Sequence, residues 1–372
     1  MITGDLDRAL ATTVSSAGTW RPAPPGTPCA VRTYATTIAF RLARGHAEGP
    51  AAIAARLAGR LGGLDWVEEA AVAGGGYLTV RVTADALARL AVRVTQAGPG
   101  CDHSTALAGT SLTAPTPARL ASARTWQEAR QQVHAAVIAR SAQAAGAQVR
   151  PPHDAERMAP PAPAAAAPGK TGLSPDAAPF PEAGFSPAAA PFPEAGFSPV
   201  AEAIAYAGAD AITYALARLR PGGPAAVNPR LAAAHHLGSP AYAVRYAHAH
   251  AASALRQAAD LGLDRGEAAG FRPRLLAHPC EQALLGELSW LPERAAGAAR
   301  RRRPDVLARC LEGLARAYLD CQEACPAEGP GTVRAGERAA EASSARLWLA
   351  AAAATALRTG LGRLGVDAPD RL

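Results

Sequence analysis

The sequence has almost no lysine, few aromatic residues and no long apolar run. Lys170 is the only lysine among 38 basic residues, and Phe, Trp and Tyr together make up 5% of the 372 residues. Such an arginine bias is typical of a genome rich in G and C and carries no functional information. The longest apolar stretch, Leu347–Leu357, is well short of the ~20 residues that cross a bilayer. We therefore expect no membrane-spanning segment.

The N-terminus and the cysteines indicate a cytoplasmic protein. The first eight residues contain Asp5 and Asp7 and no apolar run, which argues against a signal peptide. Six scattered cysteines in a chain without a leader are expected to be free thiols and not a disulfide framework. The formal net charge of +7 is a modest excess that suits an anionic partner without requiring one.

A change of composition after Val149 divides the chain. Residues 151–200 contain thirteen prolines, fourteen alanines and almost no branched aliphatic residues, so they cannot bury a core. They hold a twelve-residue repeat, SPDAAPFPEAGF from Ser174 and SPAAAPFPEAGF from Ser186, and are expected to form a disordered linker. The predicted parts are an α+β domain over 1–100, connecting helices over 101–150, the linker over 151–200 and a helical domain over 201–372.

The first part shows the patterns of a small α+β domain. Pro50 suits the first turn of a helix whose apolar residues recur every four positions. Residues 66–73 and 78–82 show strand patterns on either side of a glycine-rich turn. Asp85 is expected to cap the helix that follows. These patterns predict two short strands covered by helices.

The last part shows the patterns of a helical bundle. Apolar residues recur at spacings of three and four along most of residues 201–372. We expect five helices, over 202–219, 240–261, from Pro279, from Pro304 and over about 341–364. The fold class predicted for the whole chain is therefore mainly α, with a small α+β domain at its N-terminus.

Three sequence motifs follow one another in the last part of the chain. G-A-D-A-I-T-Y begins at Gly208, S-P-A-Y-A-V-R-Y-A-H-A-H begins at Ser239, and L-G-V-D-A-P-D-R-L ends at Leu372. They resemble the G-A-D-A-x-R-Y, N-P-V-F-Y-V-Q-Y-A-H-A-R and L-L-G-I-x-A-P-E-R-M stretches of the arginyl-tRNA synthetases. The resemblance implies a five-helix anticodon-binding domain of the type called DALR.

A weaker resemblance to the same family lies near the N-terminus. Y-A-T-T from Tyr34 stands where the family has Y-x-T-N, and V-A-G-G-G-Y, which ends at Tyr77, resembles V-A-G-P-G-F. This resemblance implies the N-terminal additional domain of the family, which touches the outer corner of the tRNA. Tyr34 and Tyr77 are therefore candidate tRNA contacts.

The catalytic motifs of that family are not found between the two resembling ends. Residues 125–128, T-W-Q-E, stand where the HIGH motif is expected and contain no histidine. Lys170 lies in proline-rich sequence without a KMSKS pattern, and G-K-T at 169–171 lacks the first glycine of a phosphate-binding loop. We therefore expect a truncated paralogue without a catalytic core, with no catalytic residues and no cofactor.

Tyr246 and His250 are the leading candidate contacts with the anticodon. They are four residues apart and share a helix face, and the resemblance places them where the family reads the anticodon. Either bases stack on Tyr246, or Tyr246 packs the bundle. His250 replaces a family arginine and removes a fixed charge. His248 is expected to be a buried hydrogen-bonding residue, and His235 a loop residue without a partner.

Arginines supply the other candidate contacts, because guanidinium groups bind phosphates. The candidates are Arg245, Arg300, Arg301, Arg302, Arg303, Arg346 and Arg371. The run at 300–303 could equally be a solvated loop, and Arg346 could be held by an internal carboxylate. Cys321 and Cys325 could ligate a metal with Cys310 or His278, but without a second C-x-x-C pair core packing is favoured, and we expect no metal.

Three functions follow from these patterns. The leading hypothesis is a non-catalytic tRNA-binding protein, with tRNA-Arg as one candidate ligand and two modules joined by the linker contacting one tRNA. The second is a protein-interaction module whose helical domain docks on a synthetase or a tRNA-dependent enzyme, with the phenylalanines of the repeats as additional contacts. The third is an arginine–tRNA ligase, alone or completed by another chain.

Overall fold

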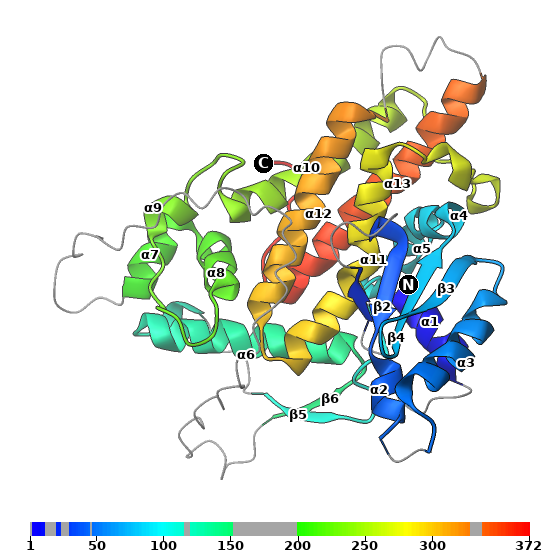
Figure 1. The fold of residues 1–372 in the computed structure, drawn as a ribbon. Coiled ribbons are helices and arrows are strands. Elements are labelled where there is room, and N and C mark those ends of the chain that lie inside the picture. Colours follow the sequence, from blue (N-terminus) through cyan, green and yellow to red (C-terminus); the bar gives the residue numbers. More distant parts are fainter. Residues whose placement is uncertain are drawn as a thin grey trace.

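The computed structural model describes residues 2–11, 20–23, 30–44, 47–114, 120–151, 199–327 and 337–372. The repeats, Lys170 and nearly all of the predicted linker lie outside these residues. In Figure 1 the N-terminal part, in blue and cyan, lies beside a body of long helices in green to red. Within the described ranges, no helix combines the length and apolarity needed to cross a bilayer.

A four-stranded antiparallel sheet forms the centre of the N-terminal part. Its strands are β1 (Trp20–Pro22), β2 (Thr33–Thr36), β4 (Tyr77–Val82) and β3 (Val67–Ala73), in that spatial order. Helix α3 (Pro50–Gly62) packs on β3 and β4, and its predicted apolar stripe is buried. Helices α1 (Ile2–Ala11) and α2 (Ile38–Leu42) contact α3. The sequence predicted β3 and β4 but missed β1 and β2.

The turn between β3 and β4 requires a glycine at one position. Gly76 has φ of +133°, and a Cβ atom there would lie 2.7 Å from Cβ of Pro50 and 2.9 Å from its carbonyl carbon. We expect Gly76→Ala to lower the free energy of unfolding by about 2 kcal/mol, because both the backbone conformation and the contact with Pro50 are strained. Gly75→Ala is the control, since that Cβ would meet nothing within 4 Å. Urea denaturation measures both, and equal losses would contradict the prediction.

The helix predicted after the sheet is divided and is capped two residues earlier than expected. It consists of α4 (Ala84–Ala88) and α5 (Leu90–Ala97), followed by the short helix η2 (Gly98–Gly100). Thr83, and not Asp85, is the N-cap, and its hydroxyl accepts a hydrogen bond from the amide of Ala86 at 3.2 Å. Asp85 lies in the first turn, where a carboxylate still interacts favourably with the helix dipole.

The segment predicted as connecting helices contains one long helix between two short parallel strands. Strands β5 (Ser111–Thr113) and β6 (Gln148–Arg150) pair in parallel, and α6 (Trp126–Ala144) lies between them in the sequence. Thr125 caps α6 by accepting a hydrogen bond from the amide of Glu128 at 3.2 Å. The stretch that stands in place of the HIGH motif is thus the start of a helix.

The C-terminal helices follow the predicted pattern with one division and one addition. The elements are α7 (Pro199–Ala207), α8 (Ala209–Arg218), α9 (Pro229–Ala232), α10 (Pro240–Asp260), α11 (Pro279–Arg300), α12 (Pro304–Ala324) and α13 (Glu337–Leu364). Gly208, with φ of +82°, divides the first predicted helix. Prolines occupy the first turns of α10, α11 and α12, as predicted.

The two ends of the chain share one hydrophobic core. Residues from Ile2 to Val366 belong to a single buried cluster. The ring of Tyr34 lies 5.0 Å from that of Trp290 on α11, and α5 packs along α13. An ion pair between Asp102 and Arg363, 2.8 Å long, joins the same parts. The expectation of two separate modules on a tether is therefore corrected, because faces that a small α+β domain would leave exposed are buried against α11 and α13.

Candidate nucleic-acid interface

A row of neighbouring rings lies along one face of α10. Tyr242, Tyr246 and His250 recur every four residues and therefore share a face. The ring centroids of Tyr242 and Tyr246 are 5.8 Å apart, and those of Tyr246 and His250 are 5.9 Å apart. His235, from the segment before α10, stacks on Tyr242 at 5.5 Å. We call these four residues the ring row.

The ring row is anchored in the core at one end and open at the other. Nδ1 of His250 is hydrogen-bonded to the hydroxyl of Tyr318 at 3.1 Å, and Tyr318 on α12 is fully buried. His235 is exposed, whereas the two tyrosines and His250 are half-buried. A row held in place on one side and open on the other is suited to stacking of unpaired bases, because every base presents a π-face.

The structure confirms that Tyr246 and His250 share a face and adds two residues that the sequence prediction missed. Tyr246 contacts rings on both sides and remains partly accessible, so packing and base stacking are compatible. Tyr242, one helical turn before Tyr246, could have been found from the same spacing. His235 could not, because its stacking depends on the path of the loop. His235 was predicted only to lack a metal-ligating partner, which its ring contact with Tyr242 does not test.

Burial determines the charge of the histidines on α10. Desolvation lowers the pKa of His250 and of His248 below the usual 6.5, so both are neutral at pH 7. His248 is fully buried; its Nδ1–H donates to the carbonyl of Pro369 at 3.0 Å, and its Nε2 accepts from Arg358 at 3.3 Å. His248 is thus the buried hydrogen-bonding residue that was predicted.

Acidification should destabilise the fold through these histidines. Their folded pKa values are lowered, so the unfolded chain binds more protons below about pH 6.5 and stability is lost as the pH falls from there. The raised pKa values of the half-buried Glu287 and Glu293 act in the opposite sense. We therefore compare variants: His248→Gln should lose less stability than the wild type between about pH 7.5 and 5.5 in urea denaturation. Equal losses would contradict this assignment.

Two of the candidate arginines are held by carboxylates inside the protein. Arg346 on α13 pairs with Glu281 on α11 at 2.8 Å, and the Glu281 side chain is 1% exposed. Arg245 pairs with Asp210 at 3.4 Å, and Asp210 also accepts a hydrogen bond from the amide of Asp367. The internal carboxylate expected as the alternative for Arg346 is therefore present. Both arginines tie helices together.

The arginine run lies at the corner between α11 and α12. Arg300 pairs with Glu293 at 3.0 Å, and Arg303 makes two hydrogen bonds of 2.7 Å to Asp305. Arg301 and Arg302 are exposed. Fifteen residues of α12 separate Arg303 from Tyr318, which is about 22 Å along the helix. The run is therefore not adjacent to the ring row.

The other candidate residues lie apart from the ring row. Tyr34 is fully buried against Trp290, so we withdraw it from the candidate RNA contacts. Tyr77 is 49% exposed and lies edge-on to Phe40 in the N-terminal part. Arg371 is exposed in the C-terminal tail. Of the predicted candidate contacts, the ring row thus contains Tyr246 and His250. Its other two members, His235 and Tyr242, were not among the candidates.

The cysteines of α12 are core residues. Burial raises the pKa of Cys310 and of Cys321 to about 12, so both are protonated thiols at neutral pH. Cys325 is also buried. Over the residues that the structure describes, no group of three or more His, Cys, Asp or Glu side chains could hold a metal ion.

Two known domain families match the two ends of the chain. Residues 244–372, which include Tyr246 and His250, match the DALR anticodon binding domain, and residues 30–82 match the arginyl tRNA synthetase N terminal domain. Both ends of the chain are thus similar to domains of the arginyl-tRNA synthetases. The resemblance inferred from the motifs is thereby confirmed.

Individual arginyl-tRNA synthetase relatives match only part of the chain. The arginine–tRNA ligase of Micrococcus luteus is 39% identical over 163 residues, which are 44% of this chain and 29% of that protein. That of Chloroflexus aggregans is 42% identical over 135 residues, 36% of this chain and 22% of that protein. The match thus spans less than a third of these relatives.

A solved structure shows the same fold. The arginyl-tRNA synthetase of Thermus thermophilus superposes with a TM-score of 0.63 at 17% identity, and the alignment covers 100% of this chain and 99% of that one. At this identity the likeness concerns the fold alone.

Proposed function

We propose that this chain, whose ends match domains of the arginyl-tRNA synthetases, binds tRNA through α10 and does not activate an amino acid. The ring row is the observation that carries the proposal. It is partly exposed, it is anchored by Tyr318, and two of its members, Tyr246 and His250, lie in the region that matches an anticodon-binding domain. In this arrangement the unpaired bases of an anticodon loop stack on Tyr242 and Tyr246, and His250 offers a polar edge beside them.

Because the imidazole of His250 is neutral, it is suited to contact with a base. It does not supply a fixed charge with which the anticodon could be recognised. A guanidinium group in that place would supply a fixed charge and a planar fork of donors. His250 is instead half-buried, hydrogen-bonded to Tyr318 and has a lowered pKa. We infer that stacking dominates the contact and that tRNAs with different anticodons bind with similar affinity.

The described segment between the two matching ends supports the non-catalytic part of the proposal. Its parallel strands, β5 and β6, are three residues long each, and the residues that stand in place of HIGH start α6. An activating enzyme needs preorganised groups at the position where charge develops on the ATP phosphates. Arginine-dependent exchange of pyrophosphate into ATP tests this part, and we expect none; measurable exchange would establish a ligase.

The experiment that tests tRNA binding compares three RNAs with the full chain. A tRNA-Arg transcript is expected to bind, and a minihelix made of its acceptor and TΨC arms should bind at least about 30 times more weakly, because it lacks the unpaired anticodon bases. A tRNA-Arg transcript with an altered anticodon should bind as the original does. Absence of affinity for any of these RNAs at low salt, or equal affinity for tRNA and minihelix, would refute the proposal.

A further inference from the structure

We propose that an arginine-lined groove between the two ends of the chain binds the phosphate backbone of RNA, as a second contact that rests on the proposed function. The groove encloses about 940 Å³ where η2, α10, α13 and the loop after α10 meet. We call it the junction groove. It exists only because the N-terminal part packs on α13, as Figure 1 shows for α5 and α13.

The junction groove carries an excess of positive charge. Arg256 comes from α10, Arg265 from the loop after it, and Arg358 and Arg363 from α13. Among the described residues that line the groove, Asp370 is the only acid, and it pairs with Arg358. Buried Asp102 pairs with Arg363. Two of the four guanidinium charges are therefore not compensated by a carboxylate.

The two uncompensated arginines are held in place by neutral groups. Arg256 donates a hydrogen bond to the backbone carbonyl of Asp370 at 3.0 Å. The guanidinium carbon of Arg265 lies 4.9 Å from the ring centroid of Trp348, whose indole N–H donates to the Arg265 carbonyl at 2.7 Å. These contacts position the two guanidinium groups and leave their charge available, which is what bidentate binding of a phosphate requires.

Small residues give the groove its depth. Three glycines and three alanines line it, together with hydroxyl-bearing threonines. The small residues are Gly98, Gly100, Gly362, Ala252, Ala351 and Ala354. Side chains of this size let an elongated ligand approach the backbone closely. Depth, hydroxyl groups and spaced guanidinium groups fit a chain of phosphates better than a flat protein partner.

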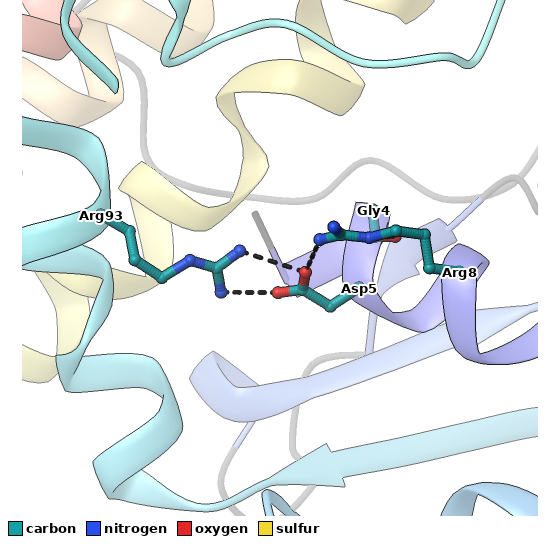
Figure 2. Close-up of polar contacts among 4 residues, drawn as sticks. All are labelled: Gly4, Asp5, Arg8 and Arg93. Atoms are coloured by element: carbon teal, nitrogen blue, oxygen red, sulfur yellow. Dashed lines mark hydrogen bonds and ion pairs between the residues drawn. The ribbon is translucent and has the colours of Figure 1, made fainter. Parts of the chain in front are cut away.

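A second cavity also contains arginines, but unlike the junction groove it has no excess of positive charge. It encloses about 690 Å³ beside α1 and α5 and is lined by Arg8, Arg89 and Arg93 together with three aspartates, so its charges cancel. Asp5 there binds Arg93 through two contacts of 2.5 and 3.1 Å and also pairs with Arg8 (Figure 2). Arginines that are bound to carboxylates in this way offer no site for an anion.

The junction groove and the ring row lie on different faces of the same helix. Arg256 follows Tyr246 by ten residues, which places it about 15 Å further along α10 and about 80° around its axis. A strand whose bases stack on the ring row therefore reaches the groove by crossing α10. The two contacts are close enough for one RNA and separate enough for independent tests.

The test uses the full chain, the double variant Arg256→Gln/Arg265→Gln and a blunt RNA duplex of about 12 base pairs, which has no unpaired bases. We expect the variant to bind the duplex about ten times more weakly, and the slope of log K against log salt to decrease in magnitude by about 1 to 2, since each lost phosphate contact removes about 0.7 to 0.9. The matched control is Arg56→Gln/Arg274→Gln. It removes the same charge from arginines that pair with Glu48 and Asp85, and it should change affinity less than about twofold.

If the two double variants weakened duplex binding equally, the assignment of the junction groove would be refuted. Circular dichroism and thermal unfolding of both variants establish that they are folded. A Tyr246→Ala variant distinguishes this inference from the proposed function, because it should weaken tRNA binding and leave duplex binding unchanged. If Tyr246→Ala leaves tRNA binding intact, the proposed stacking of bases on the ring row is refuted. The duplex experiment then still tests whether the junction groove binds RNA.

Discussion

Alanine in place of both Tyr242 and Tyr246 should weaken tRNA binding by at least about 30-fold. Stacking of a base on an aromatic side chain is worth about 1–3 kcal/mol, and a tenfold change in affinity corresponds to about 1.4 kcal/mol. The two tyrosines are neighbours in the ring row, with centroids 5.8 Å apart, so the double variant removes two stacking surfaces at once. Fluorescence anisotropy of a labelled tRNA at constant salt measures the change.

Two variants serve as controls for this result. Tyr206→Ala removes a tyrosine that is 63% exposed on α7 and lies outside the ring row, and it should change affinity less than about twofold. Tyr246→Phe keeps the ring and removes the hydroxyl, so it should bind nearly as the wild type does. If Tyr206→Ala and the double variant weaken binding equally, the ring row is not the contact surface.

Methionine in place of Arg363 should lower the free energy of unfolding by about 3 kcal/mol. The Arg363 guanidinium makes two hydrogen bonds of 2.8 Å to Asp102, whose side chain is 1% exposed. Removing the arginine leaves a buried carboxylate without its partner, which typically costs about 3–5 kcal/mol. The lower end applies because the Arg363 side chain is itself 21% exposed. Urea denaturation followed by circular dichroism measures the loss.

Arg56→Met is the matched control. Arg56 pairs with Glu48, and both side chains are more than half exposed, at 55% and 53%. An exposed pair of this kind contributes about 0–1 kcal/mol, so this variant should remain close to the wild type. Because the two ends share a core, the wild type should also unfold in one transition. Equal losses in the two variants would refute the role given to the Asp102–Arg363 pair.

The elements that the sequence predicted are those set by local patterns. Proline in the first turn fixed the starts of α10, α11 and α12, and alternating residues revealed β3 and β4. Strands β1 and β2 have three and four residues, too few for an alternating pattern to show. The helix over 202–219 has a continuous apolar pattern, and only the positive φ of Gly208 divides it.

The roles of the arginines could not be predicted, because their partners are far away in the sequence. Arg346 and Glu281 are 65 residues apart, and Arg363 and Asp102 are 261 residues apart. A guanidinium group gives no local sign of whether it faces a carboxylate or solvent. The four-residue spacing of Tyr246 and His250 was sufficient for their shared face, whereas the burial of Tyr34 depends on Trp290, which another part of the chain supplies.

The common core of the two ends has a consequence for the shape of the RNA that fits. With the ring row and the junction groove both fixed on α10, no conformational entropy is lost in bringing two mobile domains together when RNA binds. The same rigidity prevents the protein from adjusting to a ligand of different dimensions. Inserting one or two base pairs between the loop and the helical stem that it closes should therefore separate the two contacts, so that selection acts on the geometry of the RNA more than on its sequence.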